Sequence, residues 1–363
     1  MDKNKKEIAP NEAKETIEPQ VIANKTVDPQ VENIKAVDMK KLEEEKMENP
    51  MGFKVILREF EKDKVATVAF WLIVAFLSFI IITSFFISED LIVKVDIFEK
   101  YARPSKESFW TWFGKDSGGR SVMALTIVGA RNSVLIGFGV TVITTFVGLF
   151  VGLMVGYYGG KFDSIVMRIV DFISLLPVLM IIIVIVTMIA NFTAMSLILI
   201  MSAFYWIGTA RLVRSKALSE SRRDYVNASK TMGTSDLKIM YGGILPNISS
   251  ILIVDSTLAL AGNIGIETSL SFLGFGLPAN VPSLGTLIAL ASKPEIIQDK
   301  PYVWVPASLT ILFLMLCINY VGQALRRASD ARQRLGWQEV SNEKYPKKSL
   351  TTFSICYYPY CLR

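Results

Sequence analysis

Long runs of apolar residues alternate with polar segments along most of this chain. Each run has about the 20 residues that a helix needs to cross a hydrocarbon core ~30 Å thick. The runs cover residues 65–87, 134–157, 173–190, 193–212, 248–273 and 303–321. They predict an all-α membrane protein with six transmembrane helices. The third and fourth runs are separated by two residues, so we expect them to form a tight helical hairpin.

Polar segments divide the rest of the chain into three predicted parts. Residues 1–52 are rich in charge and poor in aromatic residues, which predicts a disordered tail. Residues 53–336 form the predicted membrane domain, in which residues 213–247 make a polar loop between the fourth and fifth spans. Residues 337–363 form a C-terminal tail.

Lys and Arg residues gather beside the first, fourth and sixth apolar runs. With six spans, these three regions lie on one side of the membrane, and the positive-inside rule places that side in the cytoplasm. Both termini are therefore predicted to be cytoplasmic in a multi-pass protein of the plasma membrane. The residues are Lys54, Arg58, Lys62 and Lys64, then Arg211, Arg214, Lys216, Arg222 and Arg223, and finally Arg326, Arg327, Arg332 and Arg334.

The composition excludes several kinds of enzyme. The chain has 363 residues, is 51% hydrophobic and has a net charge of +6, but it contains no histidine. Catalytic sites of the Ser-His-Asp or Cys-His kind and His-ligated zinc sites are therefore excluded. The three cysteines show no CxxC spacing, and no GxxxxGK[ST] phosphate loop occurs. We expect a non-enzymatic subunit with no metal site and no directly bound cofactor.

A helix-period pattern begins in the polar loop at Asp224, an acid suited to the first turn of a helix. Tyr225, Ala228 and Met232 have the spacing of residues on one helical face, and Gly233 suits the helix C-terminus. The pattern predicts a short amphipathic helix at the membrane face. It leaves open whether the helix rests on lipid or contacts a partner.

This stretch resembles the cytoplasmic EAA loop of ABC-importer permeases, written EAA, three residues, Gly, nine residues and I-x-L-P. The residues that match at the family's spacing are Ala228, Gly233, Leu245 and Pro246. Three positions depart from the pattern: Asn227 replaces the Glu, Ser229 replaces the second Ala, and Gly243 stands where Ile is expected. The missing Glu puts a charged contact from position 227 in doubt.

Two further segments resemble the C-type permease of oligopeptide, dipeptide and nickel importers. One precedes the second apolar run, and its matching residues are Trp112, Phe113, Gly114, Asp116, Gly119, Arg120, Gly129, Ala130, Arg131 and Ser133. The other, "ETSLSFLGFGLP" from Glu267 to Pro278, is similar to the family's E-x-x-LSFLGLG segment. The three resemblances occur in the family's order and cover much of residues 65–336.

The resemblance implies a type I ABC importer permease fold with a cytoplasmic coupling helix. The subunit would form half of a translocation pore for oligopeptides or dipeptides in a bacterial plasma membrane. Its implied partners are a homologous B-type permease, two cytoplasmic ATPases that use ATP, and an extracellular peptide-binding protein. Contact with the ATPases is implied for Asp224, Tyr225, Ala228, Ser229, Met232, Gly233, Leu245 and Pro246.

Two carboxylates lie inside the fifth apolar run. An unpaired carboxylate in mid-membrane costs about 2.5–3.5 kcal/mol on insertion scales, so Asp255 and Glu267 are expected to face protein or water. Asn263, Glu267 and Ser271 lie near one helical stripe. They are candidates either for a pore or gate lining or for hydrogen bonds between helices, and the sequence leaves both open.

Other readings compete with the peptide importer. The same architecture could carry nickel, heme or an oligosaccharide, because substrate choice can lie in the separate binding protein. A secondary transporter independent of ATP is an alternative of another class, although no inverted repeat is visible. Within the third run, Pro177 is expected to kink the helix. Arg168 and Asp171, three residues apart near the start of that run, are candidates for a pair on the inner face.

Overall fold

The computed structural model describes residues 60, 61, 63–88, 90–278 and 281–344. The predicted N-terminal tail, residues 1–52, and the last part of the predicted C-terminal tail, residues 345–363, lie outside this range. Within the described residues, the regular structure is helical apart from an isolated bridge between Lys115 and Ser121. This agrees with the predicted all-α fold class.

Five helical stretches of the described chain are long and apolar enough to cross a membrane. They are α3 (Lys64–Phe85), α5 (Val122–Tyr158), α8 (Ala194–Glu220), the stretch Asp236–Phe272 and the part Val305–Ser329 of α14 (Val305–Lys344). The stretch Asp236–Phe272 joins α10 (Asp236–Ile239), a π-helical turn (Met240–Ile244) and α11 (Leu245–Phe272). A sixth span results if the bent pair α6 (Gly160–Leu175) and α7 (Val178–Met188) is counted as one.

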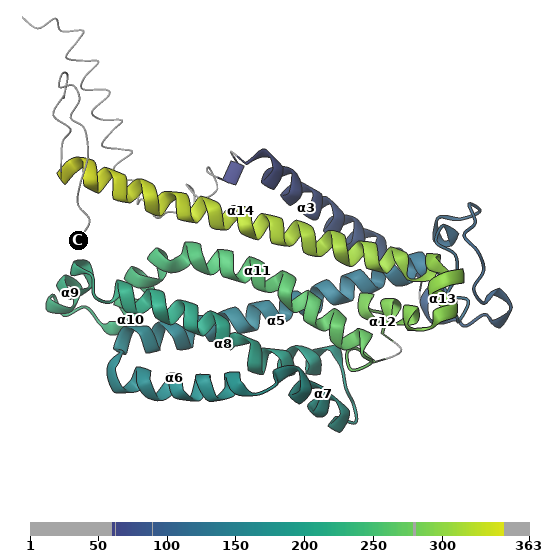
Figure 1. Ribbon diagram of the computed structural model, residues 1–363, viewed down its shortest axis with the longest axis horizontal. Helices are drawn as coiled ribbons and strands as arrows, with labels where there is room; N and C mark the ends of the chain where they lie inside the picture. Colours follow the sequence, from purple (N-terminus) through teal and green to yellow (C-terminus); the bar gives the residue numbers. More distant parts are fainter. Residues whose placement is uncertain (1–59, 62, 89, 279–280, 345–363) are drawn as a thin grey trace, which may run out of the picture. The chain divides into compact units, whose positions relative to one another are not determined.

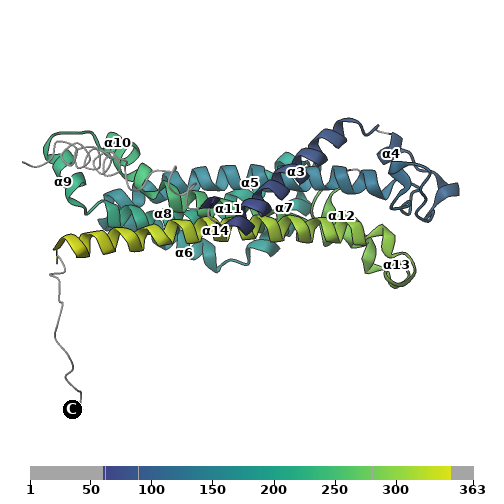
Figure 2. The same cartoon turned by 90° about the horizontal axis from the view of Figure 1, so that it is seen from above.

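Shorter elements lie at the two ends of these long helices (Figures 1 and 2). One end carries α9 (Asp224–Thr231) and α10, and we call it the α9 end. The opposite end carries α4 (Asp90–Val93) and α13 (Pro294–Asp299), with α12 (Leu284–Ala289) nearby. Four 3-10 turns complete the described elements: Ile97–Glu99, Phe109–Thr111, Leu290–Ser292 and Pro301–Val303.

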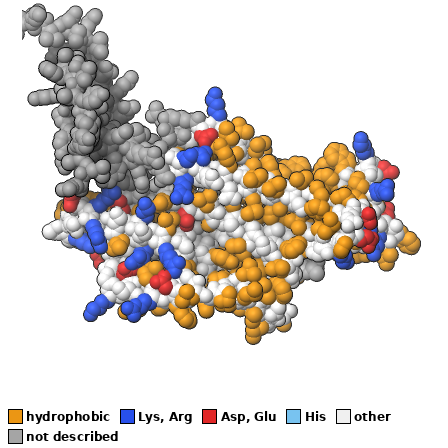
Figure 3. Space-filling model, viewed as in Figure 1, with side chains coloured by type: hydrophobic (Ala, Val, Ile, Leu, Met, Phe, Trp, Pro, Cys, Tyr) orange, Lys and Arg blue, Asp and Glu red, His pale blue; other side chains and the backbone are white. Residues whose placement is uncertain are grey.

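Side-chain chemistry changes along the long helices. On the face drawn in Figure 3, hydrophobic side chains cover a broad zone, and most Lys, Arg, Asp and Glu side chains gather toward the two ends. Many of the exposed apolar residues belong to α3 and α6, among them Trp71, Phe85 and Phe172. A surface of this kind is stable against hydrocarbon and unstable against water.

Glycines bring α5 and α8 into close contact. Gly148, Gly152 and Gly156 recur at every fourth position of α5, and each faces the backbone of α8. A Cβ atom at position 152 would lie 2.5 Å from the carbonyl oxygen of Ala210. Small residues at this spacing let membrane helices approach closely, and van der Waals packing then holds them together.

The predicted third span, residues 173–190, is divided between the end of α6 and all of α7. α6 and α7 meet at an angle of 76°. Leu176, between them, has extended backbone angles, as expected for a residue that precedes proline, and Pro177 precedes α7. The kink at Pro177 is therefore confirmed.

The predicted pair of Arg168 and Asp171 is wrong. Asp171 accepts a hydrogen bond of 2.7 Å from Arg211 of α8. A second pair joins Arg214 of α8 to Asp163 of α6. Arg211 lies at the end of the apolar run 193–212 and Arg214 in the continuation of α8 beyond it, so both arginines lie beside the acids of α6.

The segment before α5 is a tight turn built around one buried acid. Asp116 is fully buried and accepts hydrogen bonds from the backbone N–H groups of Gly118 and Arg120 and from the Arg120 guanidinium. Gly119 has a φ of +74°, and a Cβ atom there would collide with the carbonyl of Asp96. Much of the resemblance between residues 112 and 133 thus lies in a motif that shapes the entry to α5.

Candidate functional site

The polar segment between α8 and α11 folds as a compact helical corner. α8 continues to Glu220, α9 begins at Asp224, and α10 begins at Asp236 and leads directly into α11. Most of the segment predicted as a loop, residues 213–247, is therefore helical. Apolar residues dispersed among its polar ones supply the core of this corner.

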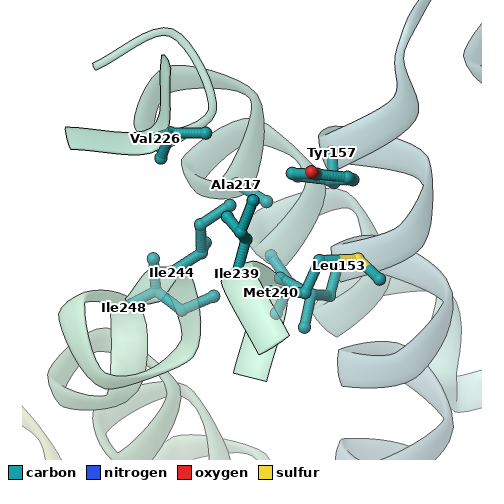
Figure 4. Close-up of a cluster of buried hydrophobic side chains, with 9 residues drawn as sticks. Leu153, Tyr157, Ala217, Val226, Ile239, Met240, Ile244 and Ile248 are labelled. Atoms are coloured by element: carbon teal, nitrogen blue, oxygen red, sulfur yellow. The ribbon is translucent and has the colours of Figure 1, made fainter. Parts of the chain in front are cut away.

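Buried apolar side chains from five helices and the π turn hold the corner together (Figure 4). Val226 is fully buried and fixes α9 against this cluster. Burial of a Val side chain contributes about 1.5–3 kcal/mol, which is substantial for a helix of two turns. The cluster consists of Leu153, Tyr157, Val213, Ala217, Val226, Ile239, Met240, Ile244 and Ile248.

The last turn of α5 makes polar contacts with the same corner. The Tyr157 hydroxyl donates a hydrogen bond of 2.6 Å to Asp236 Oδ1 at the start of α10. The Lys230 ammonium of α9 lies 4.6 Å from the centroid of the Tyr157 ring, within the range of a cation–π contact. The corner is thereby joined to α5 as well as to α8 and α11.

The predicted contact residues of α9 differ in exposure. Asp224 is exposed in the first turn, where a negative charge interacts favourably with the helix dipole. Tyr225 and Ser229 are half-buried, whereas Ala228 is exposed and Met232 is 77% exposed.

α9 ends at Thr231, and Met232 is its C-cap residue. The Met232 N–H donates to the Ala228 carbonyl, so Met232 lies one helical turn after Ala228. That Tyr225, Ala228 and Met232 share one helical face stays a prediction. Gly233 comes next with a φ of +76°, the left-handed conformation that commonly ends a helix. This agrees with its predicted place at the helix C-terminus.

Leu245 and Pro246 lie inside a continuous helical stretch. The fifth apolar run begins at residue 248, but the helical stretch that contains it begins at Asp236. The Leu245 N–H donates to the carbonyl of Met240, which gives the wide turn of a π-helix directly before the proline. Pro246 has no N–H to donate, and the irregular turn accommodates that loss.

Three large apolar side chains are exposed at the α9 end. Met232 is 77% exposed, Leu237 62% and Tyr241 45%. Together with Ala228 they offer apolar contact area on elements that the buried cluster holds in place. The corner thus combines a rigid inner face with an outer face suited to binding another protein.

The roles of several residues that build the corner were not predicted from the sequence. Val226 is the one branched aliphatic residue of α9, and that pattern could have indicated its buried position. No comparable pattern indicates the roles of Tyr157 or Glu220, because their partners in this corner lie on other elements.

The three candidate pore residues lie inside the subunit. Asn263, Glu267 and Ser271 are 5%, 0% and 2% exposed. Asn263 Nδ2 donates to Thr141 Oγ1 of α5 at 2.9 Å, and Ser271 Oγ donates to Glu267 Oε1 at 2.7 Å. Asn263 thus joins α11 to α5, whereas the bond between Ser271 and Glu267 lies within α11. A pore or gate role stays a prediction.

Asp255 also faces protein, as expected for a carboxylate within a span. Its Oδ2 atom accepts a hydrogen bond of 2.7 Å from Thr209 of α8. The contact joins α11 to α8 about halfway along α11. The expectation that the intramembrane acids face protein or water is therefore confirmed for both Asp255 and Glu267.

A different face of α11 is open. Gly262, Gly265 and Ser269 line a hollow of about 840 Å³ that α14 borders with Ser308 and Asn319. At Gly262, a Cβ atom would find open space. Small residues on an open helical face let another chain approach the backbone closely.

The sequence profile of a family described as "binding-protein-dependent transport system inner membrane component" matches residues 148–335. That match covers more than half of the chain. The chain belongs to this family. As a family member with several apolar helices, it is a multi-pass membrane protein. The matched region of this inner membrane component includes all of α8, α9 and α11.

Curated relatives extend the similarity beyond the profile. The chain is 49% identical over 278 residues to the oligopeptide transport system permease protein OppC of Lactococcus lactis subsp. lactis (strain IL1403), covering 77% of this chain and 94% of the relative. It is 36% identical over 290 residues to the oligopeptide transport system permease protein AmiD of Streptococcus pneumoniae (strain ATCC BAA-255 / R6), covering 77% and 90%. It is 31% identical over 315 residues to the dipeptide transport system permease protein DppC of Lactococcus lactis subsp. cremoris (strain MG1363), covering 76% and 89%.

Proposed function

We propose that this chain is the C-type permease subunit of an ATP-driven importer of oligopeptides or dipeptides. The observation that carries the proposal is the 49% identity to an oligopeptide permease along 94% of that protein's length. The subunit forms half of the translocation pore. A homologous B-type permease forms the other half, two cytoplasmic ATPases use ATP, and an extracellular protein delivers the peptide.

The α9 end faces the cytoplasm in this proposal. α3 begins and α14 ends toward that end in Figure 1, as an even number of crossings requires. Lys64 at the start of α3, Arg214 and Lys216 in α8, and Arg326 and Arg327 in α14 lie near the same ends of the spans. The positive-inside rule retains such segments in the cytoplasm. Both termini are then cytoplasmic.

The outer face of α9 and the following turn is the contact surface for an ATPase. Ala228 is small and exposed, and Met232, Leu237 and Tyr241 supply exposed apolar area around the same corner. Val226 and the buried cluster hold α9 in place, so a force applied to its outer face acts on the spans. Asn227 supplies no charge, so apolar contacts carry the docking.

The docking surface is tested by the variant Ala228→Trp in the complete transporter. A bulky side chain on the exposed face blocks close approach of a partner without entering the buried cluster. We expect at least about a tenfold loss of ATPase subunits co-purifying with the membrane subunits, equivalent to about 1.4 kcal/mol of binding energy.

Ser164→Trp is the matched control for this experiment. Ser164 is also an exposed small residue, and it lies on α6 outside the corner. That variant is expected to retain the ATPases. Equal retention of the ATPases by both variants would refute the docking surface.

Reconstituted vesicles distinguish the competing functions. The proposal expects uptake of labelled peptide that requires all partner subunits and ATP. Uptake by the lone subunit, driven by an ion gradient, would instead identify a secondary transporter. Competition of nickel, heme or an oligosaccharide with the peptide would identify another substrate on the same architecture.

A further inference from the structure

One tyrosine of α9 makes hydrogen bonds with both of the long helices that flank it. The Tyr225 hydroxyl donates to Glu220 Oε2 at 3.0 Å, at the last residue of α8. It accepts from Asn247 Nδ2 of α11 at 3.1 Å, and the same Asn247 nitrogen lies 3.4 Å from Glu220 Oε2. The three side chains therefore form a closed triangle across three helices, which we call the Tyr225 triangle.

The tyrosine ring also sits against the π-helical turn. A Cβ atom at Gly243 would lie 3.3 Å from Cε2 of Tyr225, closer than ordinary van der Waals contact. Gly243 is a position where the EAA-loop pattern has isoleucine. A larger residue at position 243 would push against the Tyr225 ring. The glycine that departs from the pattern therefore makes room for the tyrosine.

The triangle contains a buried charged residue. Glu220 is 7% exposed, and Arg223 Nε lies 2.9 Å from its other carboxylate oxygen. A buried carboxylate is costly unless hydrogen bonds or charges compensate it, and the triangle supplies that compensation. Burial also raises the pKa of Tyr225 above its usual value.

The covalent path from α9 to α11 contains several flexible points. It passes through Gly233, the turn before α10, and the π-helical turn with its two glycines, Gly242 and Gly243. Such points absorb a displacement by local changes in backbone angles. The hydrogen bond from Asn247 to Tyr225 bypasses all of them, because Asn247 lies beyond the π turn.

We propose that Tyr225 is a positioning residue that transmits displacement of α9 to α11 through its shared hydrogen bonds with Glu220 and Asn247. The inference rests on the proposed function, in which an ATPase moves α9. When α9 is displaced, the triangle makes the start of α11 move with it, and α11 lines the open hollow beside α14. Loss of the triangle leaves docking and the apolar contacts of Val226 intact, but it removes the polar link between α9 and α11. Less of the displacement of α9 then reaches α11 for each ATP hydrolysed.

The variant Tyr225→Phe in the complete reconstituted transporter tests this inference. It removes one hydroxyl and keeps the ring against Gly243. The measurement is the number of ATP molecules hydrolysed per labelled peptide imported. We expect this ratio to rise about fivefold or more, the lower end of typical coupling effects between sites, with unchanged co-purification of the ATPases.

Asn247→Ala provides an independent second variant, because it breaks the triangle from α11. It is expected to raise the same ratio of ATP hydrolysed to peptide imported. The double variant is expected to show a ratio no higher than that of the more severe single variant, since both changes remove the hydrogen bond between Tyr225 and Asn247. Tyr241→Phe is the matched control: this tyrosine belongs to the same corner but is 45% exposed, and its ratio is expected to stay at the wild-type value.

The outcomes separate the two proposals. A wild-type ratio in both Tyr225→Phe and Asn247→Ala would overturn the positioning role and leave the docking surface standing. Loss of ATPases from Tyr225→Phe would also overturn it, because the triangle would then serve docking and not transmission. Failure of the proposed function is recognised separately, by vesicles of the wild-type transporter that import no peptide with ATP.

Discussion

At the scale of single residues, Glu267 shows how a membrane helix can contain a carboxylate. It is fully buried, and hydroxyl groups surround it: Ser271 and Thr268 of its own helix, with Ser133 and Ser283 beside the same carboxylate. The sequence predicted that this group faces protein or water, because exposure to lipid is costly. It could not reveal the partners from α5 and from the segment before α12, because only the fold brings them together.

Removing the Glu267 carboxylate is expected to destabilise the subunit. In Glu267→Ala the surrounding hydroxyls lose their buried acceptor, which costs about 1–3 kcal/mol of unfolding free energy. Glu267→Gln retains a carbonyl acceptor, so its loss is expected to be smaller. Thermal unfolding of the purified subunit in detergent, followed by tryptophan fluorescence, measures the difference.

Ser269→Ala is the control on the same helix, because the Ser269 hydroxyl bonds to the carbonyl of Gly265 within α11 and is exposed. Its stability is expected to stay near that of the wild type. Wild-type stability in Glu267→Ala would contradict the packing role. It would favour the alternative, in which Glu267 lines the pore.

At the scale of helices, hydropathy located the spans but not their ends. The second apolar run begins at residue 134, yet α5 begins at Val122 because the Ser121 hydroxyl accepts a hydrogen bond from the Ala124 N–H and caps the helix. α8 likewise continues to Glu220, past the end of its apolar run. An apolar run indicates which part of a helix lies in lipid, whereas caps and tertiary contacts decide where the helix begins and ends.

The close contact between α5 and α8 at glycines predicts that a Gly→Ala substitution changes stability in opposite directions at two positions. Gly152→Ala places a Cβ atom 2.5 Å from the Ala210 carbonyl, so the helices must separate, at a cost of about 1–3 kcal/mol. Gly208→Ala, on an exposed face of α8 with nothing within 4 Å of the new Cβ, is expected to stabilise the helix by about 0.5–1 kcal/mol.

Thermal unfolding of the two purified variants in detergent tests this pair. The expected result is a lower midpoint for Gly152→Ala and an equal or higher midpoint for Gly208→Ala. If both variants shifted in the same direction, general helix propensity and not close packing would govern the α5–α8 contact.

At the scale of the whole molecule, the order of apolar runs predicted an even number of crossings. The described chain contains five span-length stretches and one bent pair, which gives six if α6 and α7 cross together. The bend itself could be anticipated from Pro177, but its angle could not, since it depends on how α7 packs against α8. The proposed orientation then places α9 and the 3-10 turn Phe109–Thr111 on opposite sides of the membrane.

Cysteine labelling of intact cells tests that orientation. In a background in which Cys317, Cys356 and Cys361 are replaced, the variants Lys106→Cys and Ser235→Cys each place one exposed thiol at opposite ends of the long helices. Lys106→Cys is expected to react with a membrane-impermeant maleimide added outside. Ser235 is the N-cap residue of α10 but makes no side-chain cap hydrogen bond, so its replacement by cysteine is a mild change. The Ser235→Cys thiol is expected to react only after permeabilisation.

The reverse labelling pattern would place α9 outside the cell, where no ATPase could reach it. It would refute both the orientation and the docking surface. Labelling of both thiols from outside would contradict the three crossings proposed between residues 106 and 235, which are α5, the pair of α6 and α7, and α8. It would require α6 and α7 to enter and leave the membrane on the same side.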